Sequence, residues 1–132
     1  MPTLEQAKAF FANDRYATEA TGIVIEEARQ GYARCRLDLD ARHRNAVGGV
    51  MGGVMFTMAD FVFAISTNFE VPSTVTTVAN ISFLSAAKGD TLYGESRLIK
   101  DGRSTCVYEV SITDNTGTTV ALVTMHGMHL QK

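Results

Sequence analysis

The segment from residue 45 to residue 69 constrains the fold of this chain most strongly, because it is almost entirely apolar and holds one ionisable side chain, Asp60. It starts with a glycine-rich run and continues in Met, Phe, Val, Ile and Ala. This pattern predicts a buried central helix that is apolar on every face and ends near Asn68, before Pro72. A carboxylate among such neighbours is costly unless it is paired or its pKa is raised. Asp60 is therefore a candidate functional residue.

Strands are predicted on both sides of this helix. Thr3 and Gln6 form a capping-box pattern that opens a short amphipathic helix ending near Asn13. Period-two alternation predicts strands in the ranges 22–26, 32–40, 74–84, 91–100, 103–113 and 118–130. The pair Asp101-Gly102 indicates a two-residue hairpin turn. Short turns after the helix make the last strands antiparallel neighbours, which gives an α+β fold with a sheet curled around the helix.

Length, charge and cysteine content narrow the class of protein. A chain of 132 residues predicts a single domain over 1–132. The net charge of −2, without runs of Lys or Arg, disfavours nucleic acid and anionic membranes as partners and favours a small molecule. Cys35 and Cys106 are far apart and follow no secretory signal, which indicates reduced thiols in a cytoplasmic protein. Glycines and the central Asp60 argue against a membrane span over 47–67.

The start of the predicted helix and Asp60 offer complementary chemistry. Backbone N–H groups at Gly52 and Gly53 lack intrahelical acceptors and can stabilise a developing oxyanion; alternatively the glycines only permit a tight turn or close packing. Asp60 can act chemically, or can cap a backbone group or bond the hydroxyl of Thr57. Gly52 and Asp60 are eight residues apart, about 12 Å along one helix. A functional site therefore predicts a two-fold dimer with antiparallel helices, in which each site uses both chains.

These residues resemble the hotdog-fold acyl-CoA thioesterases, especially the phenylacetate-degradation (PaaI-like) branch. That branch has an Asn, a Gly three residues later, then His-Gly-Gly and an Asp seven residues further on. Here Asn45, Gly48, the Met51-Gly52-Gly53 run and Asp60 match, and 78–84 looks like the family's strand after the helix. The resemblance covers nearly the whole chain. It implies a hotdog fold, with an antiparallel sheet wrapped around one long central helix and a short N-terminal helix.

The resemblance also implies roles for individual residues. Asp60 would be the nucleophile, or the general base for water attacking the thioester carbon. The Gly52 N–H of the partner subunit would polarise the carbonyl, and Asn45 would lie at the same site and help to hold that carbonyl or the water. Thr76 matches a position where related enzymes have a hydroxyl near the attacking water, with Thr77 as a rival. No metal or bound cofactor is implied, since coenzyme A is part of the substrate.

The predicted substrate contacts surround the helix start and the loops. The candidate substrate-binding residues are Met51, Gly53, Phe56, Phe83, Lys100 and Arg103. The candidates for an acyl or aryl pocket are Met55, Phe56, Phe61, Phe63 and Phe83, which can equally be plain core. The basic residues at loops that can meet coenzyme A phosphates are Arg44, Lys88, Lys100 and Arg103, which can equally be solvated surface groups.

Histidine is absent from the helix entrance, where Met51 stands in place of the family's His. This absence disfavours the hotdog dehydratases and hydratases, which rely on a His. His43 is predicted in a loop, and His126 and His129 are predicted on opposite faces of a strand, which argues against a metal site formed by this pair. All three are interpreted as structural.

The leading hypothesis is hydrolysis of acyl-CoA to a free acid and coenzyme A by a homodimer or a dimer of dimers (homotetramer). Asp60, Gly52 and Asn45 would carry the reaction. The alternative is a non-catalytic acyl-CoA-binding module, a sensor or carrier, which the departure at Met51 keeps open. A purely structural dimerisation domain is the third hypothesis, and it leaves Asp60 unexplained.

Overall fold

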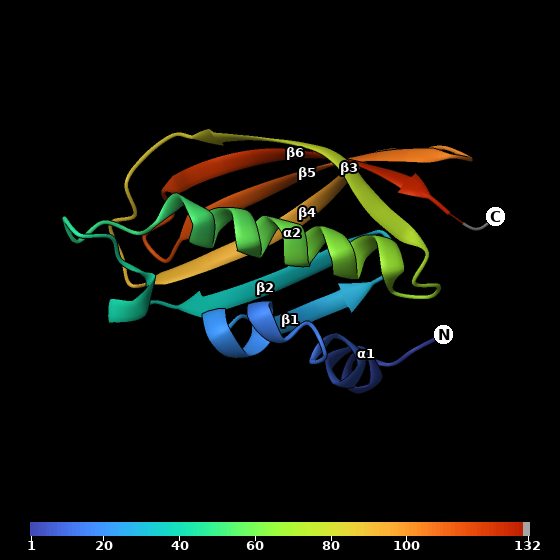
Figure 1. The fold of residues 1–132 in the computed structure, drawn as a ribbon, viewed down its shortest axis with the longest axis horizontal. Coiled ribbons are helices and arrows are strands. Elements are labelled where there is room, and N and C mark those ends of the chain that lie inside the picture. The colour runs from blue at the N-terminus through green and yellow to red at the C-terminus, as the bar shows by residue number, and fades with distance from the viewer. Residues whose placement is uncertain (131–132) are drawn as a thin grey trace.

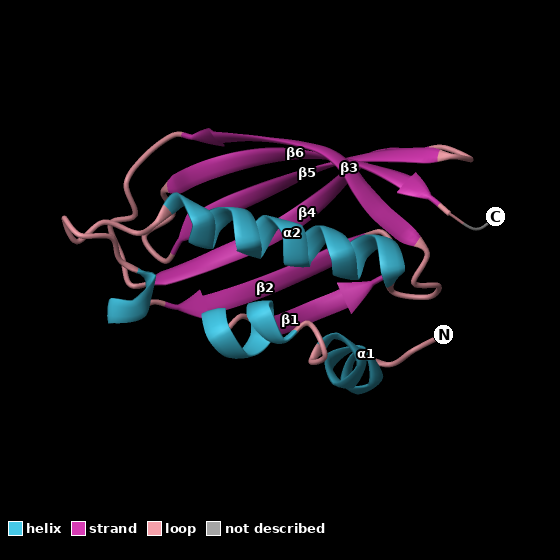
Figure 2. Ribbon diagram, viewed as in Figure 1, coloured by secondary structure: helices cyan, strands magenta, loops and turns pink. Residues whose placement is uncertain are grey.

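The computed structural model describes residues 1–130, in which six antiparallel strands form one sheet that curls around a long helix (Figures 1 and 2). The helices are α1 (Leu4–Phe11), the π-helix η1 (Tyr16–Thr21), the 3₁₀-helix η2 (Ala41–His43) and α2 (Gly52–Asn68). The strands are β1 (Val24–Arg29), β2 (Tyr32–Asp38), β3 (Thr74–Phe83), β4 (Thr91–Asp101), β5 (Thr105–Asp114) and β6 (Thr119–His129). Their order in the sheet is β1-β2-β4-β5-β6-β3, so β1 and β3 are its edges. The predicted α+β architecture is confirmed.

The N-terminal helix and the first hairpin form as the sequence predicts. The backbone N–H of Gln6 donates to Oγ1 of Thr3 at 3.1 Å, and the N–H of Thr3 donates to Oε1 of Gln6 at 2.9 Å, which completes the capping box. Strands β1 and β2 meet at a tight turn in which Gly31 has a φ of 90°, a conformation that glycine adopts without strain. Within the described residues, no helix combines the length and the apolar content that a membrane span requires.

Helix α2 packs one side closely against the concave face of the sheet. Met58 and Val62 are fully buried there, and a Cβ at Gly94 of β4 would lie only 2.8 Å from Cγ of Met58. Gly127 of β6 makes the same kind of room for Phe63. Glycines at these two strand positions therefore let the helix approach the sheet backbone, and this approach fixes the rotation of α2 about its axis.

The opposite side of α2 is open in the single chain. Gly53, Phe56 and Asp60 lie three and four residues apart and are all exposed, which corrects the prediction that the helix is buried on every face. The neighbouring edge strand β3 is also open, with Val78 59% and Phe83 58% exposed. Apolar composition had indicated burial on every side, but the single curled sheet of this chain covers only one side of the helix.

The turn between β4 and β5 differs from the predicted two-residue hairpin. Asp101 is the last residue of β4 and the loop is 102–104, closed by a hydrogen bond from the Gly102 N–H to the Thr105 carbonyl at 2.8 Å. Nε2 of His129 lies 2.8 Å from Oδ1 of Asp101, and Nδ1 of His129 lies 2.8 Å from Oγ1 of Thr74. These contacts hold Asp101 in the strand, which moves the turn one residue further along the chain.

Asp114, at the end of β5, organises the 85–90 loop before β4. Its carboxylate accepts hydrogen bonds from the hydroxyl and N–H of Thr116, and from the N–H groups of Lys88, Gly89 and Thr118, at 2.7–3.1 Å. The hydrogen bond from the Thr116 hydroxyl, and then those from the backbone N–H groups of Lys88, Gly89 and Thr118, hold the pKa of Asp114 well below its ordinary value of 3.8. Burial of the carboxyl acts in the opposite direction.

We expect Asp114→Asn to lower the free energy of unfolding by about 2 kcal/mol at about pH 7, because the amide replaces one of two accepting oxygens. A carboxyl whose pKa is lowered in the folded state stabilises the fold fully above its unfolded pKa and loses that contribution as pH falls. The difference between wild type and variant should therefore shrink between about pH 4 and pH 2 in urea titrations. A difference that stays constant over this range would contradict the assignment.

Candidate active site

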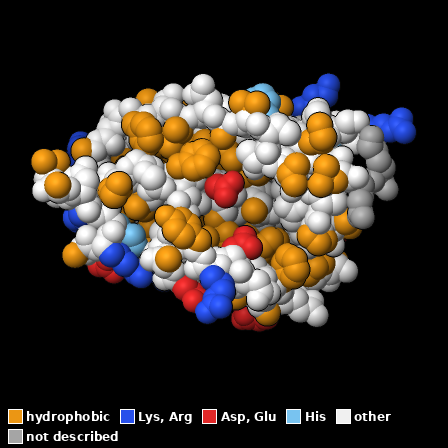
Figure 3. All heavy atoms as spheres, in the orientation of Figure 1, with side chains coloured by type: hydrophobic (Ala, Val, Ile, Leu, Met, Phe, Trp, Pro, Cys, Tyr) orange, Lys and Arg blue, Asp and Glu red, His pale blue; other side chains and the backbone are white. Residues whose placement is uncertain are grey.

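Asp60 projects from the open side of α2 without a polar partner. Within residues 1–130 its carboxylate forms no hydrogen bond or ion pair, and the hydroxyl of Thr57 donates instead to the Gly53 carbonyl at 2.8 Å. The alternative in which Asp60 caps a backbone group or bonds Thr57 is therefore wrong. Acidic side chains occupy the middle of this face of the molecule, with hydrophobic side chains around them (Figure 3). Such an unpartnered carboxylate is free to meet a ligand.

The surroundings of Asp60 favour its protonated form. Its cavity of about 290 Å³ is lined by Asp14, Arg15, Tyr16, Ala17, Thr57, Asp60 and Phe61. Although the side chain reaches the surface, the loss of water around its carboxylate raises the pKa of Asp60, and the charge of Asp14 raises it further. A carboxylate with a raised pKa is a stronger base than an ordinary one.

The start of α2 presents unpaired backbone donors. Gly52 and Gly53 are its first two residues, where N–H groups have no intrahelical acceptor, and the N-cap Met51 forms no side-chain cap. A Cβ at Gly52 would lie 2.9 Å from the ring of Phe83, so close packing is one reason for this glycine. A Cβ at Gly53 would meet nothing within 4 Å, so packing does not explain the second. The helix dipole adds partial positive charge at this end.

The loop before α2 is closed by Asn45. Oδ1 of Asn45 accepts hydrogen bonds from the N–H groups of Val47 at 3.1 Å and Gly49 at 3.0 Å, and the Asn45 N–H donates to the Gly49 carbonyl at 2.7 Å. Gly48 has a φ of 90° and donates to the Asn45 carbonyl at 3.0 Å. The Asn45 side chain thus shapes the tight loop that aims the first N–H groups of α2.

Met51 and His43 differ in exposure, since Met51 is exposed and His43 is buried. Met51 is 49% exposed and borders a cavity of about 190 Å³ beside Gly53. His43 is buried: Nδ1 accepts from the Asp40 N–H at 3.0 Å, so Nε2, 2.7 Å from the Thr21 carbonyl, carries the proton that it donates. Both nitrogens of His43 are occupied, and the interpretation of His43 as structural is supported. It lies in η2 and not in an irregular loop.

Thr76 and Thr77 lie on either side of a β-bulge in β3. Thr76 pairs with Gly127, where a Cβ would lie 2.8 Å from the Phe63 ring of α2. Since paired residues share a face of the sheet, Thr76 belongs to the face turned toward the helix. Thr77 is the bulged residue, and its hydroxyl donates to the His126 carbonyl at 3.2 Å. Position therefore favours Thr76 over its rival.

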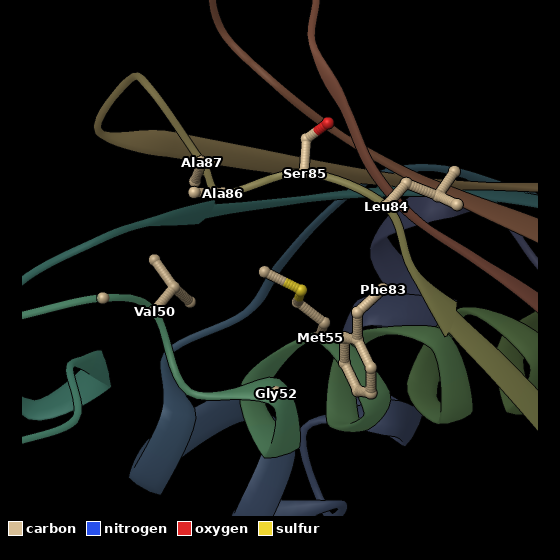
Figure 4. A pocket seen from close by; sticks show the side chains of 9 residues that line it. Val50, Gly52, Met55, Phe83, Leu84, Ser85, Ala86 and Ala87 are labelled. Atoms are coloured by element: carbon tan, nitrogen blue, oxygen red, sulfur yellow. The ribbon is translucent and has the colours of Figure 1, made fainter.

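A second cavity, of about 520 Å³, adjoins the start of α2 (Figure 4). It is lined by Gly49, Val50, Gly52, Met55, Phe83, Leu84, Ser85, Ala86 and Ala87. Met55 and Phe83, two of the predicted pocket residues, point into it (Figure 4). Phe56 lies instead on the open side of α2, Phe61 borders the Asp60 cavity, and Phe63 is core with 1% exposure. No pattern in the sequence predicts that residues 85–87 line this cavity.

The predicted basic contacts do not gather around the helix start. Lys100 pairs with Val107 near the end of β4, at the end of the sheet opposite to Phe83, and Arg103 lies in the loop that follows (Figure 1). Of the other two, Arg44 donates to the Gly48 carbonyl at 3.3 Å, beside the entrance of α2. One chain therefore does not bring Lys100 and Arg103 to its own cavity at Gly52. Residues 1–130 hold no cluster of three or more His, Cys, Asp or Glu side chains fit to bind a metal.

Comparison with known proteins places this chain in a family. Residues 47–121 match the model of the thioesterase superfamily. The chain is 32% identical over 119 residues to the acyl-coenzyme A thioesterase PaaI of Escherichia coli (strain K12), which covers 89% of this chain and 84% of that protein.

Solved structures of similar proteins have the same fold as this chain. The E. coli PaaI protein from the phenylacetic acid degradation operon has a TM-score of 0.82 at 27% identity, over 95% of this chain and 96% of that one. The protein smu.793 from Streptococcus mutans UA159, bound to acetyl CoA, has a TM-score of 0.75 at 26% identity, over 83% of this chain and 90% of that one.

A curled antiparallel sheet around one long helix is the hotdog fold, which this chain shares with the E. coli PaaI structure. The chain belongs to the thioesterase superfamily and is a thioester hydrolase.

Proposed function

We propose that this protein hydrolyses acyl-CoA thioesters to a free carboxylic acid and coenzyme A. The unpartnered carboxylate of Asp60 on the open side of α2 is the observation that carries the proposal. The similarity to an acyl-coenzyme A thioesterase and to a structure bound to acetyl CoA supports acyl-CoA as the substrate class. The chemistry needs no metal or resident cofactor, because a carboxylate and backbone donors suffice for attack and for charge stabilisation.

The active form is a homodimer in this proposal, alone or within a dimer of dimers. β3 is an edge strand, and Val75, Val78, Phe83 and Leu84 at this edge are all exposed. An apolar edge strand is a template for pairing with another strand. Antiparallel pairing of two β3 strands about a two-fold axis makes the α2 helices antiparallel and covers their open sides. The start of α2 in one chain then lies toward Asp60 of the other.

The reaction follows from these groups. The Gly52 N–H of one chain donates to the thioester carbonyl oxygen, and the partner's Asp60 takes a proton as water attacks the carbonyl carbon. The resulting oxyanion is stabilised at the start of α2 until the C–S bond breaks. The sulfur leaves with the proton as the free thiol of coenzyme A, and the acid remains. Direct attack by Asp60 gives the same products through an anhydride, which water then opens.

The remaining site residues support this chemistry. Asn45 holds the loop that aims the Gly52 N–H, and Thr76 presents a hydroxyl on the helix-facing side of β3. Phe83 and Met55 receive part of the substrate in the 520 Å³ cavity. Met51 and Gly53 border the 190 Å³ cavity on the other side of the helix start, and Phe56 is exposed on the open side of α2. Lys100 and Arg103 can reach coenzyme A only from the partner chain, because they lie at the far end of their own sheet.

A non-catalytic acyl-CoA-binding module is the second candidate function. Met51 favours it, because an apolar side chain stands at the helix entrance where the family pattern has His. Thiol release from a panel of aliphatic and aryl acyl-CoA thioesters separates the two functions. We expect one class to be hydrolysed. Saturable binding of a non-hydrolysable thioether analogue without any turnover of the panel would establish the binding module instead.

A single turnover in oxygen-18 water distinguishes the two roles of Asp60. General-base catalysis puts the label in the product acid during the first turnover. Direct attack, followed by opening of the anhydride at the Asp60 carbonyl, puts the label in the Asp60 carboxylate first.

A further inference from the structure

A second carboxylate, Asp14, borders the same cavity as Asp60. The cavity lies between α2 and the segment that leads from α1 into η1, and Asp14 and Asp60 both line it. Asp14 has no hydrogen-bonded or ion-paired side-chain partner within residues 1–130. Two unpartnered carboxylates thus share a space of about 290 Å³.

The backbone of Asp14 is held in place. Its carbonyl accepts hydrogen bonds from the N–H groups of Ala17 and Thr18, both at 3.0 Å, and from the Thr18 hydroxyl at 3.2 Å. Ala17 is buried in the core and anchors this segment. The position of Asp14 beside α2 is therefore a property of the fold and not of a free loop.

Within residues 1–130, no Lys, Arg or His side chain forms an ion pair with Asp14 or Asp60. Arg15 also lines the cavity, but its Nε pairs with Oε2 of Glu19 at 3.1 Å on the exposed surface and not with either Asp carboxylate. Tyr16 contributes a neutral phenol, and α2 carries no ionisable side chain besides Asp60. These are the charged and titratable groups that line the cavity from α2 and from the N-terminal segment. Asp60 therefore faces a like charge, which disfavours its ionisation.

We propose that Asp14 is a positioning residue that acts through Asp60, and that its negative charge sets the pH range in which Asp60 accepts a proton during hydrolysis. The inference rests on the proposed function for its catalytic meaning. A nearby negative charge makes Asp60 a stronger base, and it also moves the loss of activity on acidification to higher pH. Burial of the carboxyl, and then the charge of Asp14, raise the pKa of Asp60, which agrees with this geometry.

Carbon-13 NMR titration of the Asp60 carboxyl tests the proposal without relying on activity. We expect the Asp60 midpoint to move to lower pH in Asp14→Asn and to keep its wild-type position in Asp14→Glu, which retains the charge. Glu5→Gln removes an equal charge from the exposed start of α1, outside the cavity, and should leave the midpoint unchanged. Added salt should lower the midpoint in wild type more than in Asp14→Asn, because it screens the pair.

The pH dependence of kcat/KM provides the second readout, with the acid limb moving to lower pH in Asp14→Asn. An unmoved midpoint in Asp14→Asn, or an equal movement in Glu5→Gln, would overturn the role of Asp14 whether or not the protein is active. Absence of thioester hydrolysis by wild type would instead overturn the proposed function, and the NMR titration would still decide whether Asp14 controls Asp60.

Discussion

Asp60→Asn is expected to lower kcat/KM for acyl-CoA hydrolysis by about 100-fold or more. The amide keeps the shape of the side chain but can neither take a proton from water nor attack a carbonyl. Asp60 makes no hydrogen bond or ion pair within the described residues, so its substitution breaks no polar interaction of the single chain. Thiol release under substrate-limited conditions measures the loss.

The matched control for Asp60→Asn is Thr57→Val, one turn earlier on α2, where the hydroxyl bonds only to the Gly53 carbonyl. This change tests whether any alteration on the open side of α2 disrupts the protein. Thr57→Val should retain far more activity than Asp60→Asn, while both keep the wild-type melting temperature within a few degrees. Equal activity of wild type and Asp60→Asn would remove Asp60 from the mechanism.

Gly52→Pro is expected to lower kcat by about 100- to 1000-fold, because proline removes the N–H that stabilises the oxyanion. Gly52 is the first helical residue of α2, a position at which proline fits the backbone. Met51 before it has φ −63° and ψ 136°, a conformation that tolerates a following proline. The substitution therefore removes one donor and leaves the helix start in place.

Gly52→Ala is the control for that experiment. It adds the Cβ that displaces the exposed ring of Phe83, as proline does, but it keeps the N–H. We expect Gly52→Ala to retain most of the kcat that Gly52→Pro loses. If both variants lost activity equally, the contact with Phe83 and not the N–H would be the reason for the glycine at this position.

The sequence alone predicted the elements that depend on local pattern. Helix α2 was predictable because its apolar run is bounded by glycines and by Pro72, and the strands after it because their alternation is regular. Asp60 stood out because it is the only ionisable side chain in that run. These features depend on near neighbours in the chain, so they need no knowledge of the tertiary structure.

Other features depend on how the sheet is assembled. The open side of α2 was missed because composition does not show which side of a helix the sheet covers. Lys100 was predicted to bind the substrate, but the strand register places it at the end of the sheet that lies away from the start of α2 in the same chain. Asp14 carried no signal, since an Asp between a helix and a strand is common. Its relation to Asp60 follows only from the packing of η1 beside α2.

Subunit mixing tests whether the site is built from Asp60 of one chain and Gly52 of the other. Asp60→Asn and Gly52→Pro are each expected to be inactive alone, but a mixed dimer contains one site in which both residues are intact. Equal amounts of the two variants, unfolded together and refolded, should regain about a quarter of wild-type activity, since half of the dimers are mixed and each has one intact site of two. A mixture as inactive as its two components would contradict the shared site and would place Asp60 and the N–H donor within a single chain.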